Sequence, residues 1–294
     1  MKKIFAFLMA LVLTMCFVAC GTNGELKKPE IIAQDATSGT ATQEEGREAS
    51  IEQCVLVEEK GVKITAKSLE KGSIFGAELK LLIENNSGKN LTFQSRNTSV
   101  NGYMVETLMS EDVANGKKAN TSLTFSESSF ELCNITEIAD MEFCFHIFTS
   151  EDWDTYLDTK PIQLKTSLAD SYNYQFDDSG EVAYTGKDIK IIVKGLSENS
   201  SIFGPGIVVY LENNNKKNIT VQIRDVSING FMVDGLFSTE VVTGKRAVDT
   251  ITFMSSDLEE NNIIAIEDVE LSFHIFETDG WDTIVDTDVV KIAF

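Results

Sequence analysis

The sequence predicts an all-β protein in which one antiparallel β-sandwich unit occurs twice in tandem. Three observations lead to this prediction. Residues 74–164 match the chain 128 residues later without a gap, and about two in five positions are identical. Short segments in which apolar and polar residues alternate recur in both copies, separated by turn residues. In neither copy does a window of 12 residues carry a convincing helical stripe of apolar residues.

The internal repeat defines the domain organisation. The matched motifs are Glu84-Asn85-Asn86 with Glu212-Asn213-Asn214, Asn101-Gly102 with Asn229-Gly230, Phe145-His146-Ile147-Phe148 with Phe273-His274-Ile275-Phe276, and Trp153-Asp154-Thr155 with Trp281-Asp282-Thr283. Chance does not produce this many matches at one offset. We therefore predict a first repeat over residues 51–165, a linker over 166–177 and a second repeat over 178–294.

Several elements of the first copy have a local sequence signal. The segment Val62–Ala66 alternates apolar and polar residues, as a half-buried strand does. A longer apolar strand, Ala77–Ile83, ends at the turn cluster Asn85–Gly88. Gly116-Lys117 opens a strand that ends at Phe125, and Ser128–Glu131 suggests a single helical turn. The second copy repeats these signals.

Asn101-Gly102 stands between two β-prone runs and predicts a tight hairpin, because a type I′ turn needs positive φ at both central residues. The same dipeptide recurs at Asn229-Gly230. About seven short strands in ~115 residues, with turns every 8–12 residues, are typical of an immunoglobulin-like sandwich. The predicted fold is therefore two tandem antiparallel immunoglobulin-like β-sandwiches.

The N-terminus has the pattern of a secretory signal. Met1-Lys2-Lys3 is basic, and the apolar run Ile4–Ala19 is shorter than the ~20 residues that a spanning helix needs. The run closes on Phe17-Val18-Ala19-Cys20-Gly21, which resembles the lipobox of bacterial lipoproteins, with Phe17 where that family usually has Leu. The resemblance implies cleavage after residue 19 and lipidation of the Cys20 sulfur. A diacylglycerol anchor would hold the chain stably on the membrane.

Residues 21–50 are rich in Thr, Ser, Gly, Ala, Gln and Glu and contain no aromatic residue. Such a segment cannot bury a core, so we expect residues 20–50 to be the lipidated cysteine and a disordered tether. The expected location is the cell membrane, with the folded part on the extracytoplasmic side.

The two repeats themselves resemble the tandem immunoglobulin-like repeats of uncharacterised lipoproteins from anaerobic Gram-positive bacteria. The resemblance is carried by Ser99–Val105, by Gly116–Ala119, and by Phe145–Phe148 with Trp153-Asp154-Thr155. It implies a fold and a cell-envelope setting, and no activity.

The charge balance excludes some partners. The chain has 46 acidic and 25 basic side chains, a formal net charge of −21. A surface this negative repels phosphate backbones, so nucleic-acid binding is excluded. The first repeat carries a net charge of −7 and the second −11.

No catalytic constellation is present in the sequence. Once the signal is removed and Cys20 is lipidated, Cys54, Cys133 and Cys144 remain, and a Cys133–Cys144 disulfide is an open question. His146 lies two residues from Cys144 on one strand face, but no acid at a suitable spacing orients this histidine. We predict no enzyme and no cofactor.

Two binding sites are possible from the residue types. Clustered carboxylates near the tryptophans, above all Asp152, Asp154, Asp279 and Asp282, are weak candidates for Ca²⁺ ligands, because hard cations prefer oxygen. Trp153 and Trp281, with Tyr103 or Phe231, are candidates for an aromatic platform for a sugar ring. Packing of each tryptophan on the edge of its sandwich is the more common arrangement.

The leading hypothesis is a non-catalytic, lipid-anchored lipoprotein that displays two interaction domains to an unknown envelope protein or glycan. One alternative is a carbohydrate or small-ligand binding module that serves a surface enzyme or transporter. Another alternative is a calcium-stabilised spacer.

Overall fold

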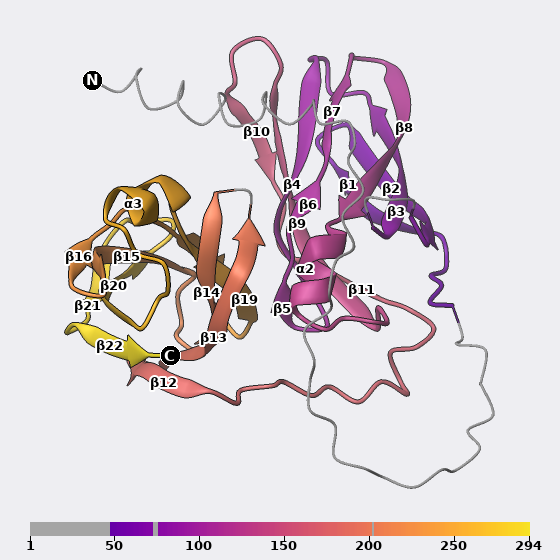
Figure 1. Ribbon diagram of the computed structural model, residues 1–294. Helices are drawn as coiled ribbons and strands as arrows, with labels where there is room; N and C mark the ends of the chain where they lie inside the picture. Colours follow the sequence, from indigo (N-terminus) through magenta and orange to yellow (C-terminus); the bar gives the residue numbers. More distant parts are fainter. Residues whose placement is uncertain (1–47, 73–75, 202) are drawn as a thin grey trace, which may run out of the picture. The chain divides into compact units, whose positions relative to one another are not determined.

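The structure is a computed structural model that describes residues 48–72, 76–201 and 203–294 (Figure 1). The described residues form an all-β, sandwich-like fold with two short helices, so the predicted fold class is confirmed. The predicted signal peptide and Cys20 lie outside the described residues. In the described part of the chain, no helix is long and apolar enough to cross a bilayer. Gly46–Phe294 is one compact unit, and its division into two domains stays a prediction from the repeat.

The first repeat contributes two groups of antiparallel strands. One sheet has the order β1-β2-β3-β8-β6, and its strands are Cys54–Glu59, Val62–Glu70, Glu78–Asn85, Lys117–Phe125 and Thr107–Leu108. The other group has the order β10-β9-β4-β5, with strands Thr155–Asp158, Asp140–Thr149, Leu91–Val100 and Tyr103–Met104. Strand β7 (Ser110–Val113) pairs with β4, and β11 (Ile162–Lys165) pairs with β9. Helix α2 (Glu127–Leu132) connects β8 to β9.

The second repeat has the same strands in the same relation. One group has the order β19-β14-β13-β12, with strands Arg246–Phe253, Gly204–Asn213, Ile189–Ser201 and Glu181–Gly186, and β17 (Gly235–Leu236) pairs with β19. The other sheet has the order β16-β15-β20-β21, with strands Phe231–Met232, Ile219–Ile228, Asp268–Glu277 and Thr283–Asp286. Strands β18 (Ser238–Val241) and β22 (Val290–Ala293) pair with β15 and β20. Helix α3 (Ser255–Glu260) corresponds to α2.

The local predictions from turn chemistry are confirmed. Asn101 and Gly102 have φ values of 51° and 85°, and Asn229 and Gly230 have 51° and 82°, as a type I′ turn requires. The helical turn predicted at Ser128–Glu131 lies within α2.

Alternation along β9 separates the core from the outer face of the sheet. Met141, Phe143, Phe145 and Ile147 are buried, while the intervening Glu142, Cys144 and His146 are only partly buried. Each repeat thus has its own hydrophobic core. The partly buried side chains of β9 therefore share the outer face of the sheet, and the candidate site lies on that face.

The two repeats also touch. Strand β5 of the first repeat pairs in parallel with β19 of the second through Tyr103 and Arg246, so a sheet of one repeat continues into a sheet of the other. Ile192 and Tyr210 of the second repeat belong to the core of the first, and Met104 packs against the core of the second.

Candidate functional site

Each repeat exposes its tryptophan at the same loop. Trp153 lies between β9 and β10 and is 74% exposed, and Trp281 lies between β20 and β21 and is 75% exposed. Their φ values are 62° and 61°, in the left-handed region that bulky side chains rarely adopt. The Trp153 N–H donates to the Thr149 carbonyl at 2.9 Å, and the Trp281 N–H donates to the Glu277 carbonyl at 2.8 Å. The same backbone hydrogen bond therefore closes the tryptophan loop in both repeats.

Each tryptophan is stacked on a phenylalanine of the preceding strand. The ring centroids of Phe148 and Trp153 are 5.3 Å apart with an interplanar angle of 15°, and those of Phe276 and Trp281 are 5.5 Å apart at 13°. Both phenylalanines are buried. The stacking fixes the plane of each indole, and most of its surface remains in solvent. The edge packing predicted from the sequence is thus present, together with an exposed ring.

A histidine extends each stack along the strand. The ring centroids of His146 and Phe148 are 5.2 Å apart, and those of His274 and Phe276 are 5.1 Å apart. We call His146, Phe148 and Trp153 the first aromatic row, and His274, Phe276 and Trp281 the second aromatic row.

An acid holds each histidine, contrary to the expectation from the sequence. His146 Nδ1 lies 2.5 Å from Asp158 Oδ1, and His274 Nδ1 lies 2.6 Å from Asp286 Oδ1. These residues are directly opposite each other in the β9–β10 and β20–β21 pairs. The separation of twelve positions hid the pairing, since it depends on the register of the hairpin.

The surroundings of the rows are polar and acidic. Gln94 and Gln222 stand opposite the histidines on β4 and β15. Arg224 Nη1 lies 3.2 Å from Asp286 Oδ1. Carboxylates flank both tryptophans in sequence: Glu151, Asp152, Asp154, Asp279 and Asp282. Such a face offers many hydrogen-bond acceptors and repels anions.

Tyr103 and Phe231 do not join the tryptophans. Leu91 pairs with Thr149 at one end of β4, and Val100 pairs with both Met141 and Tyr103 at the other end. Ten residues of extended strand, about 30 Å, therefore separate the Tyr103 turn from the Trp153 loop. Tyr103 is also only 7% exposed. The same register holds in the second repeat, so the predicted four-residue platform reduces to the two tryptophan stacks.

The predicted calcium ligands do not converge. Among the described residues, no group of three or more His, Cys, Asp or Glu side chains has a geometry that could hold a metal ion. The nearby carboxylates have other partners, since Asp158 and Asp286 hold the histidines and Glu277 pairs with Lys217 at 2.7 Å. The calcium-stabilised spacer has no support in this geometry.

The three described thiols are unbridged, and the burial of two of them favours the protonated form. Cys54, Cys133 and Cys144 are free, so Cys133 and Cys144 are not bridged. Burial raises the pKa of the Cys144 thiol, with the carboxylates of Glu142 and Asp158 adding to the effect. Burial likewise raises the pKa of the Cys133 thiol to about 11. A protonated thiol is a poor nucleophile at neutral pH.

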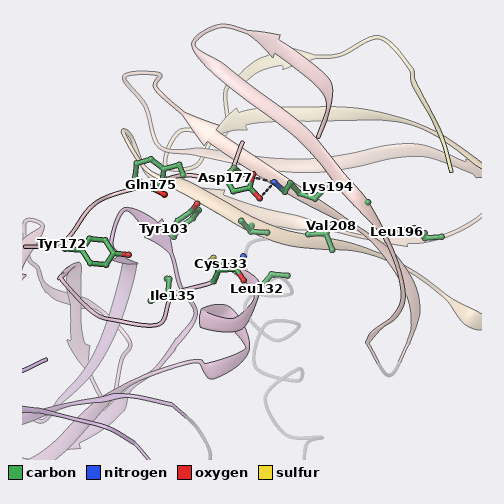
Figure 2. Close-up of a pocket in the computed structure, with 14 residues that line it drawn as sticks. Tyr103, Leu132, Cys133, Ile135, Tyr172, Gln175, Asp177, Lys194, Leu196 and Val208 are labelled. Atoms are coloured by element: carbon green, nitrogen blue, oxygen red, sulfur yellow. Dashed lines mark hydrogen bonds and ion pairs between the residues drawn. The ribbon is translucent and has the colours of Figure 1, made fainter. Parts of the chain in front are cut away.

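A cleft of about 480 Å³, which the sequence did not predict, lies where the linker passes between the repeats (Figure 2). Its lining includes Tyr103, Cys133, Phe176 and Val248. At its rim, Lys194 Nζ lies 2.8 Å from Asp177 Oδ2. The hydrogen bonds from Lys194 and Ser179 lower the pKa of Asp177 to about 2. The charges of Asp177 and Lys194 at the rim thus neutralise each other. Local patterns could not reveal it, because its walls come from six separate segments of the chain.

No protein-family model matches the chain. No curated protein matches it either. Among solved structures, the crystal structure of the YadV chaperone at 1.63 Å resolution is similar to 74% of this chain over 92% of its own length, with 10% sequence identity and a TM-score of 0.23. At so low a TM-score and sequence identity, the similarity supports no conclusion about function.

Proposed function

We propose that this chain is a non-catalytic, lipid-anchored binding protein on the extracytoplasmic side of the membrane, and that each repeat presents its aromatic row to a sugar ring. One observation carries the proposal. Trp153 and Trp281 are about three-quarters exposed, yet each is held in a fixed plane on a buried phenylalanine. Two repeats that differ at more than half of their positions keep this arrangement.

The arrangement suits a saccharide because a fixed indole offers an apolar face to the C–H groups of a pyranose, while polar neighbours bind its hydroxyls. Preorganised rings lose little conformational entropy on binding. The acidic surroundings disfavour uronic or sialic acids. They favour neutral sugars, and amino sugars gain a further attraction to the indole face.

The proposal includes no catalysis, because each His–Asp pair lacks a competent nucleophile beside it. The residue two positions before His146 is Cys144, and burial raises the pKa of its thiol. The equivalent residue before His274 is Ser272. Ser272 Oγ donates to the Arg224 carbonyl at 3.4 Å rather than to the histidine.

Fluorescence tests the saccharide proposal directly, since the chain contains only two tryptophans. Titration with chitosan tetraose or cellotetraose is expected to shift the emission, and oligogalacturonate is not. In Trp153→Phe and Trp281→Phe, the remaining tryptophan reports its own site. Calorimetry is expected to give two sites in the parent chain, one site in each single Trp→Ala variant and none in the double variant.

Phe231→Ala is the matched control, because Phe231 is an exposed aromatic at the far end of the same sheet. It is expected to bind as the parent chain does. Absence of binding to every neutral and amino saccharide tested would falsify the platform. The anchor is tested separately with an alkyne palmitate analogue: the parent chain is expected to be labelled in the bacterium, and Cys20→Ser is not.

A further inference from the structure

The contact between the two repeats is built from a few residues at the Asn101-Gly102 hairpin. The Arg246 N–H donates to the Gly102 carbonyl at 3.0 Å, and Lys245 Nζ lies 3.2 Å from Glu142 Oε1. Arg246 Nη2 also lies 2.9 Å from Glu212 Oε1, which orients the guanidinium. One face of this contact belongs to the hairpin end of a repeat, and the other belongs to the beginning of strand β19.

The second repeat carries the same hairpin end, and there it is open. Gly230, Phe231, Met232 and Glu270 correspond to Gly102, Tyr103, Met104 and Glu142 at the offset of 128 residues. Phe231 is 48% and Met232 67% exposed, whereas Tyr103 is buried. A Cβ on Gly230 would meet no atom within 4 Å, whereas one on Gly102 would meet the Phe176 ring at 3.3 Å.

The open hairpin end exposes several large apolar side chains to solvent. Ile264 is fully exposed, and the first repeat has Thr136 at that position. The Asn229 side chain donates to the carbonyl of Ala265 at 2.8 Å, so Ile264 belongs to the same end of the sheet as Phe231. We call Phe231, Met232 and Ile264 the apolar tip. Exposed apolar residues gathered at one end of a molecule mark an interaction surface.

The first repeat carries the complementary face, which is also open. Lys117 and Lys118 of β8 correspond to Lys245 and Arg246 of β19, and both are exposed. Lys118 forms an ion pair with Glu84, as Arg246 does with Glu212. The basic side chain is therefore held in the same way on both strands.

From these correspondences we infer that the apolar tip of one chain docks on the start of strand β8 in a second copy of the same chain. The contact would repeat the internal one: the Lys118 N–H would donate to the Gly230 carbonyl, and the Lys117 ammonium would join Lys291, 3.0 Å from Glu270, at that carboxylate. The basic pair of one copy thus meets the more acidic repeat of the next copy. This inference does not depend on the proposed ligand.

The geometry makes the contact heterologous, since the two docking faces are different surfaces. A head-to-tail contact that does not close produces open chains of copies. The new contact is weaker than the internal one, because Thr65, Leu82 and Asn120 stand where the second repeat has Ile192, Tyr210 and Val248. Assembly is therefore expected to depend on concentration.

Sedimentation velocity tests the inference on the mature chain, residues 20–294, with Cys20→Ser to prevent lipidation. The weight-average mass is expected to rise as the protein concentration is raised from about 5 to about 500 µM, a range that brackets the dissociation constants of weak protein contacts. Phe231→Ser with Met232→Ser blocks the tip, and Lys117→Glu blocks the other face. These three side chains are exposed, so their replacement leaves the core intact.

Each blocked variant is expected to remain a monomer when alone. An equimolar mixture of the two variants retains one tip and one β8 face, and is expected to form dimers and nothing larger. A parent chain that stays monomeric over the whole range overturns the inference, as do variants that assemble like the parent or a mixture without dimers.

Discussion

Trp153 and Trp281 show how a single residue can oppose its local backbone preference. A positive φ favours Gly or Asn, and a bulky residue held there costs about 1–3 kcal/mol. The stacking on Phe148 and Phe276 offsets part of this cost. The repeat of the tryptophan was visible in the sequence, but its exposure was not, because exposure depends on how the loop closes over the sheet.

A buried asparagine organises the turn before β4 and before β15. The Asn213 side chain is fully buried, and its Nδ2 donates to the carbonyls of Lys217 and Val241 at 2.9 and 2.8 Å. Its Oδ1 accepts from the Asn215 N–H at 2.9 Å. Asn85 makes the equivalent bonds in the first repeat. The hydrogen bonds of the first asparagine thus explain why the Asn-Asn pair occurs in both repeats.

Asn213→Ala is expected to lower the free energy of unfolding by about 2–4 kcal/mol, because it leaves buried backbone groups without partners. Urea denaturation measures the loss. The neighbouring Asn214→Ala is the control, since Asn214 is exposed, and its effect is expected to stay within about 0.5 kcal/mol. Equal effects of the two substitutions would contradict the assigned role.

At the scale of elements, the local signals predicted the longer central strands, both helical turns and both hairpins, and they did not predict the short edge strands such as β6, β7 and β10. Strand β8 begins at Lys117 and ends at Phe125, as the Gly116-Lys117 signal and the predicted end at Phe125 indicated. These elements depend on alternation and on turn chemistry, which act between neighbours in the chain. The pairing of His146 with Asp158 depends on register between strands and was missed.

The two Asn-Gly turns allow a comparison within one molecule. Gly230→Ala is expected to lower the free energy of unfolding by about 1 kcal/mol, from the left-handed backbone alone. Gly102→Ala is expected to cost more, because its Cβ would also press on Phe176. Chemical denaturation of both variants under the same conditions measures the difference. If Gly102→Ala proves no more costly, the linker does not pack on this turn.

At the scale of the molecule, Arg246 connects the repeats. Its guanidinium carbon lies 3.8 Å from the centroid of the Phe176 ring in the linker, and its backbone pairs with Tyr103. Tyr103 and Phe176 contact each other edge to face, with centroids 5.3 Å apart. Tyr103 was predicted to bind a ligand with the tryptophan, and the structure uses it at this contact instead.

Arg246→Ala is expected to lower the free energy of unfolding by about 2–4 kcal/mol, because it removes the cation–π contact and leaves the largely buried Glu212 without its partner. Differential scanning calorimetry is expected to show the repeats melting at separate temperatures. Lys118→Ala, the equivalent change in the first repeat, also breaks an ion pair, with Glu84, but the Lys118 side chain is mostly exposed, so the change is expected to cost less than Arg246→Ala. A single unshifted transition in Arg246→Ala would show that the repeats are coupled elsewhere.

Asp177 in the linker makes the stability of the fold depend on pH. The pKa of Asp177 falls from its ordinary 3.8 to about 2 in the folded chain, chiefly through the hydrogen bond from Lys194. A carboxylate with a depressed pKa stabilises the fold above its unfolded value and loses that contribution as it is protonated. The contribution is therefore present above about pH 4 and lost toward pH 2. Its size is small because the Asp177 side chain is exposed.

Asp177→Asn is expected to reduce the loss of stability between pH 4 and pH 2, measured by urea denaturation at each pH. The two curves should converge at the acid end, where Asp177 is protonated in the parent chain as well. Parallel curves across this interval would contradict the role of the Asp177–Lys194 pair.

The sequence by itself determined the all-β class, the tandem repeat, the hairpins and the acidic surface, because these depend on periodicity, turn chemistry and composition. It also supports the predicted signal and the Cys20 anchor. Only the tertiary structure decided that the tryptophans are exposed on a stacked phenylalanine, that Asp158 and Asp286 hold the histidines, and that Tyr103 is buried between the repeats. Each of these facts depends on which residues the strand register and the contact between the repeats bring together, and neighbours in the chain carry no record of that.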